Sequence, residues 1–194
     1  MRRWRKRILI GLAILAAVGV WKFVSYQQRY PYGWSHCCDL QLLGALQHYA
    51  ENHDGWFPRG EATPEASLSL LYGVKNLEVS ANLLRGKTVP DEVVRTRLES
   101  GELLTPETCG WHYVEGLRKG DDPELALFWD KAGLGHNGER DPHGGHYVGF
   151  VSGQVKYVTG DRWEQFLVDQ EGMRKAMIGT RVIHVVRRNL IMNW

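Results

Sequence analysis

The N-terminus constrains the fold and location of this chain more than any other segment. Residues 2–7 carry Arg or Lys at every position except Trp4. The segment Ile8–Val20 then runs without a charged side chain. A basic flank before an apolar helix keeps the amino end in the cytoplasm. This pattern predicts a single-pass anchor over residues 1–25 and one exported domain over residues 26–194.

A cleaved signal peptide is the alternative for the same segment. The run Ile8–Val20 is shorter than the roughly 20 residues of a typical span and resembles a signal-peptide core. Cleavage after Gly19 is conceivable, but Trp21 and Phe23 continue the apolar character where small polar residues are normal. Both alternatives export the domain. We expect an inner (cytoplasmic) membrane protein whose C-terminal domain is periplasmic or extracellular.

Charge and aromatic content narrow the function classes. The net charge is +2, and the basic N-terminal flank accounts for more than all of it. The exported part is therefore mildly acidic, which argues against nucleic acid as a partner. Eight Trp and eight Tyr residues are enough for a compact core with amphipathic edges.

The three cysteines predict one disulfide in an oxidising compartment. Cys37 and Cys38 are adjacent, so Cys109 can pair with either of them. A redox-active pair is disfavoured because the Cys-x-x-Cys spacing is absent.

Helices are predicted in the first half of the chain. Apolar residues at helical spacing indicate a helix from Ser35 or Asp39 to about Asn52. Thr63 and Pro64 begin a second helix, and a third begins at Pro90. Each of these helices is short and amphipathic.

Strands are predicted in the second half. Four short aromatic or β-branched runs lie at residues 111–114, 125–129, 146–151 and 154–158. Ser152 and Gly153 separate the last two runs by the length of a tight hairpin turn. A helix over 162–171, stopped by Gly172, and a last strand over 181–186 complete the pattern. The fold class is therefore α+β: an N-terminal membrane-anchor helix, short helices, then a small antiparallel sheet with a C-terminal helix.

Two segments resemble type II secretion pseudopilin-like (prepilin-like) envelope proteins. Residues 38–58 are similar to their early helix, with Leu-Gly-Ala-Leu followed by Tyr and then Asp-Gly-Trp-Phe-Pro. Residues 143–155 resemble their C-terminal hairpin, which begins with His-Gly-Gly, and residues 128–131 resemble the strand that precedes it.

The resemblance implies a pseudopilin-like fold and envelope or secretion-system proteins as partners, but no catalytic activity. Pilin-like proteins carry Gly followed by Phe-Thr-Leu-x-Glu at their processing site. The segment Arg7–Gly11 has neither the Phe nor the Glu, so processing and filament assembly are not predicted.

A His-rich loop over residues 130–146 is the strongest candidate for chemistry. Its candidate metal ligands are Asp130, His136, His143 and His146, and zinc is the metal that such imidazoles favour. Calcium through Asp130, Glu139 and Asp141 is a second option. The spacing matches no specific zinc signature, and an exposed Gly-rich loop explains the same residues.

Three functions fit these features. The first is a membrane-anchored structural or interaction protein without catalytic activity. The others are a metal-dependent periplasmic enzyme and a ligand-binding module, each using loop 130–146. The tripeptide Gly86-Lys87-Thr88 lacks the first Gly of a phosphate-binding loop and is interpreted as a chance match.

Overall fold

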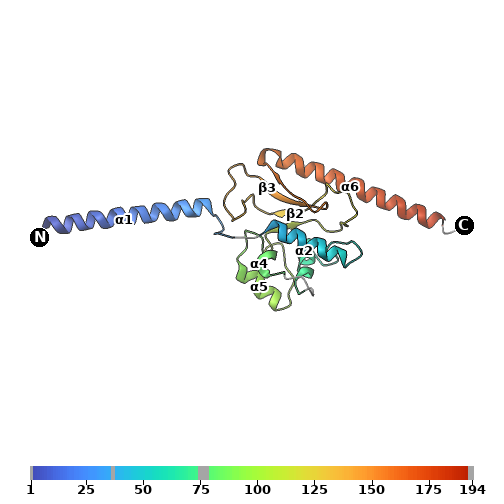
Figure 1. The fold of residues 1–194 in the computed structure, drawn as a ribbon, viewed down its shortest axis with the longest axis horizontal. Helices are drawn as coiled ribbons and strands as arrows, with labels where there is room; N and C mark the ends of the chain where they lie inside the picture. The colour runs from blue at the N-terminus through green and yellow to red at the C-terminus, as the bar shows by residue number, and fades with distance from the viewer. Residues whose placement is uncertain (1, 36–37, 74–78, 192–194) are drawn as a thin grey trace.

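A computed structural model describes residues 2–35, 38–73 and 79–191 of the chain. It consists of a long N-terminal helix, a central α+β domain and a long C-terminal helix that projects from the opposite end of the domain (Figure 1). The outer ends of these two helices therefore lie far apart.

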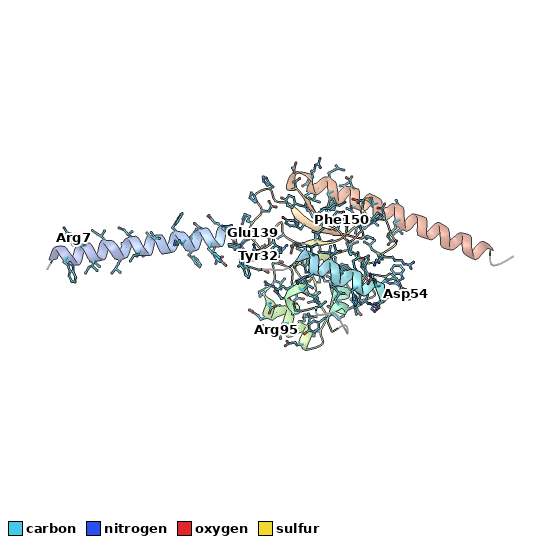
Figure 2. All side chains as sticks on the ribbon, in the orientation of Figure 1. Arg7, Tyr32, Asp54, Arg95, Glu139 and Phe150 are labelled. Atoms are coloured by element: carbon cyan, nitrogen blue, oxygen red, sulfur yellow. The ribbon has the colours of Figure 1, made fainter. Side chains whose placement is uncertain are left out.

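Helix α1 (Arg2–Arg29) includes the predicted anchor and extends beyond it. The most apolar 18-residue window of its segment Lys6–Arg29 has a mean hydropathy of 2.2, and none of this window is buried against the domain. Within the described residues, α1 is the one helix that is long and apolar enough to cross a membrane. Its 28 residues are about 42 Å long at 1.5 Å per residue. Large apolar side chains along it, such as Leu15 and Trp21, are exposed. The side chains of α1 project away from the helix without meeting the domain over most of its length (Figure 2).

The predicted short helices are confirmed. Helix α2 (Asp39–Glu51) buries Leu42, Leu43 and Leu46 in the core. Helix α3 (Pro64–Leu68) continues into the 3₁₀ turn η1 (Ser69–Leu71), and Thr63 Oγ1 accepts a hydrogen bond from the Ala66 amide at 3.1 Å, as an N-cap does. Helices α4 (Ala81–Leu84) and α5 (Asp91–Glu99) follow.

The predicted antiparallel sheet is also confirmed. Strands β1 (Trp111–Tyr113), β2 (Ala126–Asp130), β3 (His146–Phe150) and β4 (Val155–Val158) are hydrogen-bonded in the order β1-β2-β3-β4. The β3–β4 hairpin has one more loop residue than the two expected, since the Phe150 amide donates to the Gln154 carbonyl at 2.9 Å. Gly153 has φ +82° at the end of this loop, a conformation that favours glycine.

Helices cover both faces of the sheet (Figure 1). Helix α2 contacts β3 and β4 on one face, and Gln47 of α2 donates to the Val151 carbonyl at 3.0 Å. Helix α6 (Gly160–Ile191) covers the other face, where its Phe166 ring packs on Phe150 at 6.1 Å. Phe150 is buried, as expected for the largest side chain in the middle of the hairpin.

Two predictions for the C-terminal region are wrong. Helix α6 does not stop at Gly172, and the run 181–186 is helical instead of forming a strand. Extending an existing helix requires ordering only one more residue at a time, whereas a strand needs a sheet edge to pair with. Gly172 lowers the stability of the helix by only about 1 kcal/mol, and the packing of the preceding turns can outweigh this loss.

Candidate functional site

The structure separates most of the predicted metal ligands. Asp130, at the end of β2, is buried and directs its carboxylate to Lys87. His146, at the start of β3, places Nδ1 2.9 Å from the Asp130 carbonyl oxygen and stacks its ring on Trp163 at 3.9 Å. His143 is exposed, and His136 lies on the wall of a small cavity.

The two other carboxylates of the loop stabilise local turns. Glu139 Oε2 accepts a hydrogen bond from the Asn137 amide at 2.8 Å. Asp141 accepts one from the His143 amide at 2.7 Å and another from the Tyr157 hydroxyl at 2.5 Å. Among the described residues, no group of three or more His, Cys, Asp or Glu side chains is arranged to hold a metal ion. The proposed zinc or calcium site therefore has no preformed ligand set in this part of the chain.

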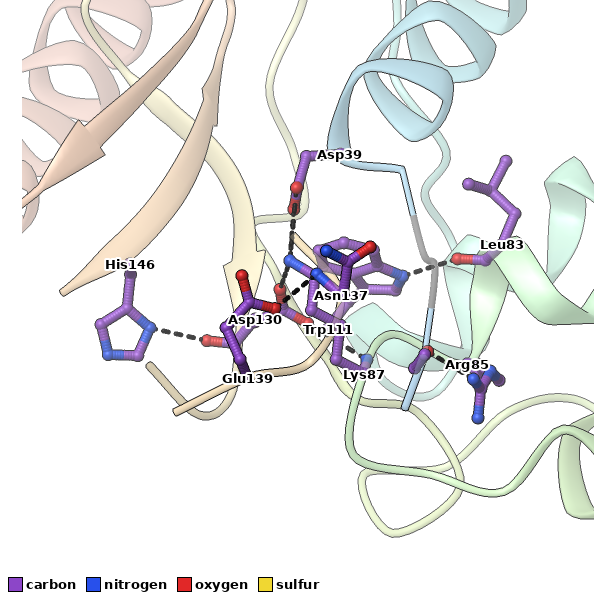
Figure 3. A network of polar contacts seen from close by, with 10 residues as sticks. Asp39, Leu83, Arg85, Lys87, Trp111, Asp130, Asn137, Glu139 and His146 are labelled. Carbon is purple, nitrogen blue, oxygen red and sulfur yellow. Dashed lines mark hydrogen bonds and ion pairs between the residues drawn. The ribbon is translucent and has the colours of Figure 1, made fainter. Parts of the chain in front are cut away.

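A buried lysine between two aspartates is the most unusual polar feature of the domain (Figure 3). The Lys87 side chain is fully buried, and Asp39 and Asp130 are 6% and 1% exposed. Lys87 Nζ donates to Oδ1 and Oδ2 of Asp39 at 3.1 and 3.2 Å and to Oδ2 of Asp130. The Lys87 amide donates to Oδ1 of Asp130 at 3.2 Å. We call these three residues the buried triad.

Two glycines allow the lysine to reach this position. Gly86 has φ +67°, and a Cβ on it would lie 2.8 Å from the Gly110 backbone. The Gly110 amide donates to the Arg85 carbonyl at 2.8 Å, which joins the loop to the chain just before β1. This close approach directs Lys87 inward, between the start of α2 and the end of β2.

The electrostatics of the triad follow from its burial. Burial raises the pKa of Asp130 to about 7, although the Lys87 ammonium acts to lower it. Burial acts to lower the pKa of Lys87, but the attraction of Asp130 and Asp39 outweighs it and raises that pKa. One ammonium between two carboxylates leaves an excess negative charge when all are ionised. Near neutral pH the triad can therefore hold an additional proton on Asp130.

Aromatic rings and a small cavity surround the triad. Lys87 Nζ lies 5.7 Å from the centre of the Trp111 ring and 5.8 Å from that of Tyr147. The Trp111 indole donates to the Leu83 carbonyl at 2.8 Å, so its ring is held in place. A cavity of about 250 Å³ borders Asp39 and Tyr147; its other lining residues are Cys38, Leu40, His136 and Val155.

The predicted disulfide is not formed between the described cysteines. Cys38 and Cys109 are both free, so the pairing of Cys109 with Cys38 is not observed. Cys37 lies outside the described residues. The Cys109 thiol donates to the Leu84 carbonyl at 3.4 Å, and burial raises its pKa to about 12. A thiol that stays protonated in a packed core is a poor nucleophile.

Sequence reasoning singled out Asp130 as a candidate metal ligand, but it did not connect Asp130 with Asp39 or Lys87. The three residues are far apart along the chain, and no local motif links them. Lys87 lies in the Gly-Lys-Thr tripeptide, whose glycine has a packing role. Only a tertiary contact brings the lysine to the two carboxylates.

The comparisons with known proteins identify no relative. The chain matches no protein-family model, and no curated protein and no solved structure is significantly similar to it.

Proposed function

We propose that this protein is a single-pass, membrane-anchored protein of the cell envelope with a structural or protein-interaction role. The observation that carries the proposal is the exposed apolar surface of α1. Leu9, Leu15 and Trp21 are 64%, 70% and 68% exposed and have no partner in the domain. Exposure of this apolar surface to water is unfavourable, and insertion into a bilayer would bury it.

The junction between α1 and the domain supports an anchoring role. The Arg140 amide donates to the Arg29 carbonyl at 2.7 Å, so loop 130–146 caps the last turn of α1. The Ser35 amide donates to the Asn137 carbonyl of the same loop at 3.0 Å, and the nearby Tyr32 is half exposed. Tyr and Trp side chains are favoured at the bilayer surface. The loop would then face the membrane and hold the domain next to it.

The arrangement of elements also supports the pseudopilin-like proposal. A long N-terminal helix is followed by an α+β domain in which α2 packs on an antiparallel sheet (Figure 1). The two segments that resemble the family, residues 38–58 and 143–155, contribute α2 and the β3–β4 hairpin. These elements contact each other in the core. Envelope or secretion-system proteins are the partners that this resemblance implies.

Membrane extraction of a matched pair of variants tests the anchor. Leu12→Arg together with Leu15→Arg places two charges in the apolar part of α1, at a cost of about 2.5 to 3.5 kcal/mol each for insertion. We expect this variant to appear in the alkaline-soluble fraction. Leu40→Arg, at a site 66% exposed on the domain, should stay in the membrane like the parent protein. Equal extraction of parent and double variant would contradict the anchor.

Affinity purification from membranes tests the interaction role. After chemical crosslinking, the tagged full-length chain should retain specific envelope proteins that are absent from an untagged control. Recovery of the chain alone, at several crosslinker concentrations, would argue against a role in an assembly.

A further inference from the structure

The buried triad combines an amine, a carboxyl group and a second carboxylate in direct contact. We propose that Lys87 and Asp130 become joined by an intramolecular amide bond between Lys87 Nζ and Asp130 Cγ, with Asp39 as the proton-transfer group. Reactants held in contact react as if at very high concentration, with effective molarities of about 10⁵ to 10⁸ M in well-oriented cases. The protein would thus carry a covalent crosslink that it forms itself.

Each side chain has a defined role in this reaction. Lys87 Nζ is the nucleophile, and the electrophile is Cγ of Asp130, which carries the Oδ2 atom that Nζ contacts. Asp39 lies with both oxygens at 3.1 and 3.2 Å from Nζ, within reach of the protons that the amine must lose. The Lys87 amide, 3.2 Å from Asp130 Oδ1, stabilises the negative charge that develops on this oxygen.

The reaction balances without an oxidant or a co-reactant. It starts from the Lys87 ammonium, a protonated Asp130 and an ionised Asp39. Asp39 accepts a proton from the ammonium, and the free amine attacks Cγ to form the C–N bond. Asp39 then gives its proton to Oδ2 and takes the second proton from the nitrogen, so that the C–O bond breaks and water leaves.

The products are one amide, one water molecule and a neutral Asp39. The triad therefore loses all of its formal charge, which removes the cost of keeping ions in a low-dielectric core. The adjacent cavity of about 250 Å³ has room for the released water, which occupies about 30 Å³ in the liquid. The surrounding Trp111 and Tyr147 rings limit access of water to the new bond.

Mass spectrometry of the full-length chain tests the proposal. We expect the intact mass to fall below the sequence mass by one water molecule. Trypsin should yield a single joined product of residues 86–95 and 120–131, uncut after Lys87. Dehydration at Asp54-Gly55 would lower the intact mass by the same amount, but it would not join these two peptides. A chain of full sequence mass, or one that trypsin cuts after Lys87, would overturn the proposal.

Variants of the triad distinguish the chemistry from a simple ion pair. Asp130→Asn should lose one ammonia in place of water, because the amide nitrogen is then the leaving group. Asp39→Asn keeps both reacting groups and should retain the full mass, as should Lys87→Met. Lys156→Met, which removes the exposed ion pair with Glu124, is the matched control and should still lose one water. Loss of water in Lys87→Met would overturn the assignment, whether or not the other variants fold.

Discussion

Gly149 lies in the middle of β3, opposite Phe128 of β2. A Cβ at this position would be 2.2 Å from Cε1 of the buried Phe128 ring. Gly149→Ala should therefore force the ring to move and lower the free energy of unfolding by about 1 to 3 kcal/mol. Urea unfolding of the detergent-solubilised chain, followed by tryptophan fluorescence, measures the change.

Gly44 provides the control for this substitution. It is an exposed glycine in α2 with no heavy atom within 4 Å of an added Cβ. Gly44→Ala should raise the free energy of unfolding by about 0.5 to 1 kcal/mol, because alanine loses less conformational freedom in a helix. A loss of stability in both variants would contradict the packing at Gly149.

His146 predicts a pH dependence of stability. Burial holds the pKa of His146 below its usual 6.5, although the hydrogen bond that Nδ1 donates to the Asp130 carbonyl acts to raise it. At His146 the folded state therefore binds fewer protons than the unfolded state just below pH 6.5, and this contribution to stability is lost as the pH falls. Asp130, whose pKa burial raises to about 7, acts in the opposite direction over the same range. The contribution of His146 is therefore measured as the difference in melting temperature between the parent and a variant without the imidazole, from about pH 7 to pH 5.

Two histidine variants check the source of this effect. His146→Phe keeps a ring against Trp163 but cannot be protonated, so its melting temperature should increase relative to that of the parent as the pH falls through the same range. His143→Gln, at an exposed position, should follow the parent curve. Identical slopes in the parent and in His146→Phe would assign the acid sensitivity to other groups.

At the scale of elements, Gln170 attaches α6 to the sheet. Its side chain is 7% exposed; Oε1 accepts from the Ala126 amide at 2.7 Å, and Nε2 donates to the Glu124 carbonyl at 2.9 Å. Gln170→Ala leaves these buried backbone groups without partners, which should cost about 1 to 3 kcal/mol. Gln165→Ala on the same helix removes only an exposed contact with Asp169 and should change stability by less than about 0.5 kcal/mol. Chemical denaturation of both variants tests this attachment.

Local signals predicted the elements of the domain better than its C-terminal helix. The Thr63 cap, the Pro64 helix start and the aromatic and β-branched runs of the strands depend on neighbouring residues alone, and the structure confirms them. The run 181–186 is rich in β-branched residues, which favour strands, but it follows a helix that is already held by Trp163 and Phe166. Context outside the run decided its conformation.

At the scale of the whole molecule, the basic flank predicts the orientation in the membrane. Replacing Arg2, Arg3, Arg5, Lys6 and Arg7 by Gln should weaken or scramble the orientation, because the proposed topology depends on these cations. Reporters fused after Trp194, one active only in the cytoplasm and one active only outside it, measure the distribution. Arg95→Gln, on an exposed helix of the domain, should leave it unchanged. A parent fusion active only in the cytoplasm would contradict the predicted topology.

The sequence alone determined the properties that depend on short stretches: the apolar N-terminal helix, the positions of the short helices and the four strands. Hydrophobic periodicity, caps and turn residues act over a few residues and can be read without a structure. The buried triad and the free thiol of Cys109 were decided only by the tertiary structure. Asp39, Lys87 and Asp130 belong to three separate segments, and their burial depends on how α2, the Gly86 loop and β2 pack. Such contacts form between residues that no local pattern connects, because they arise from packing of the whole chain.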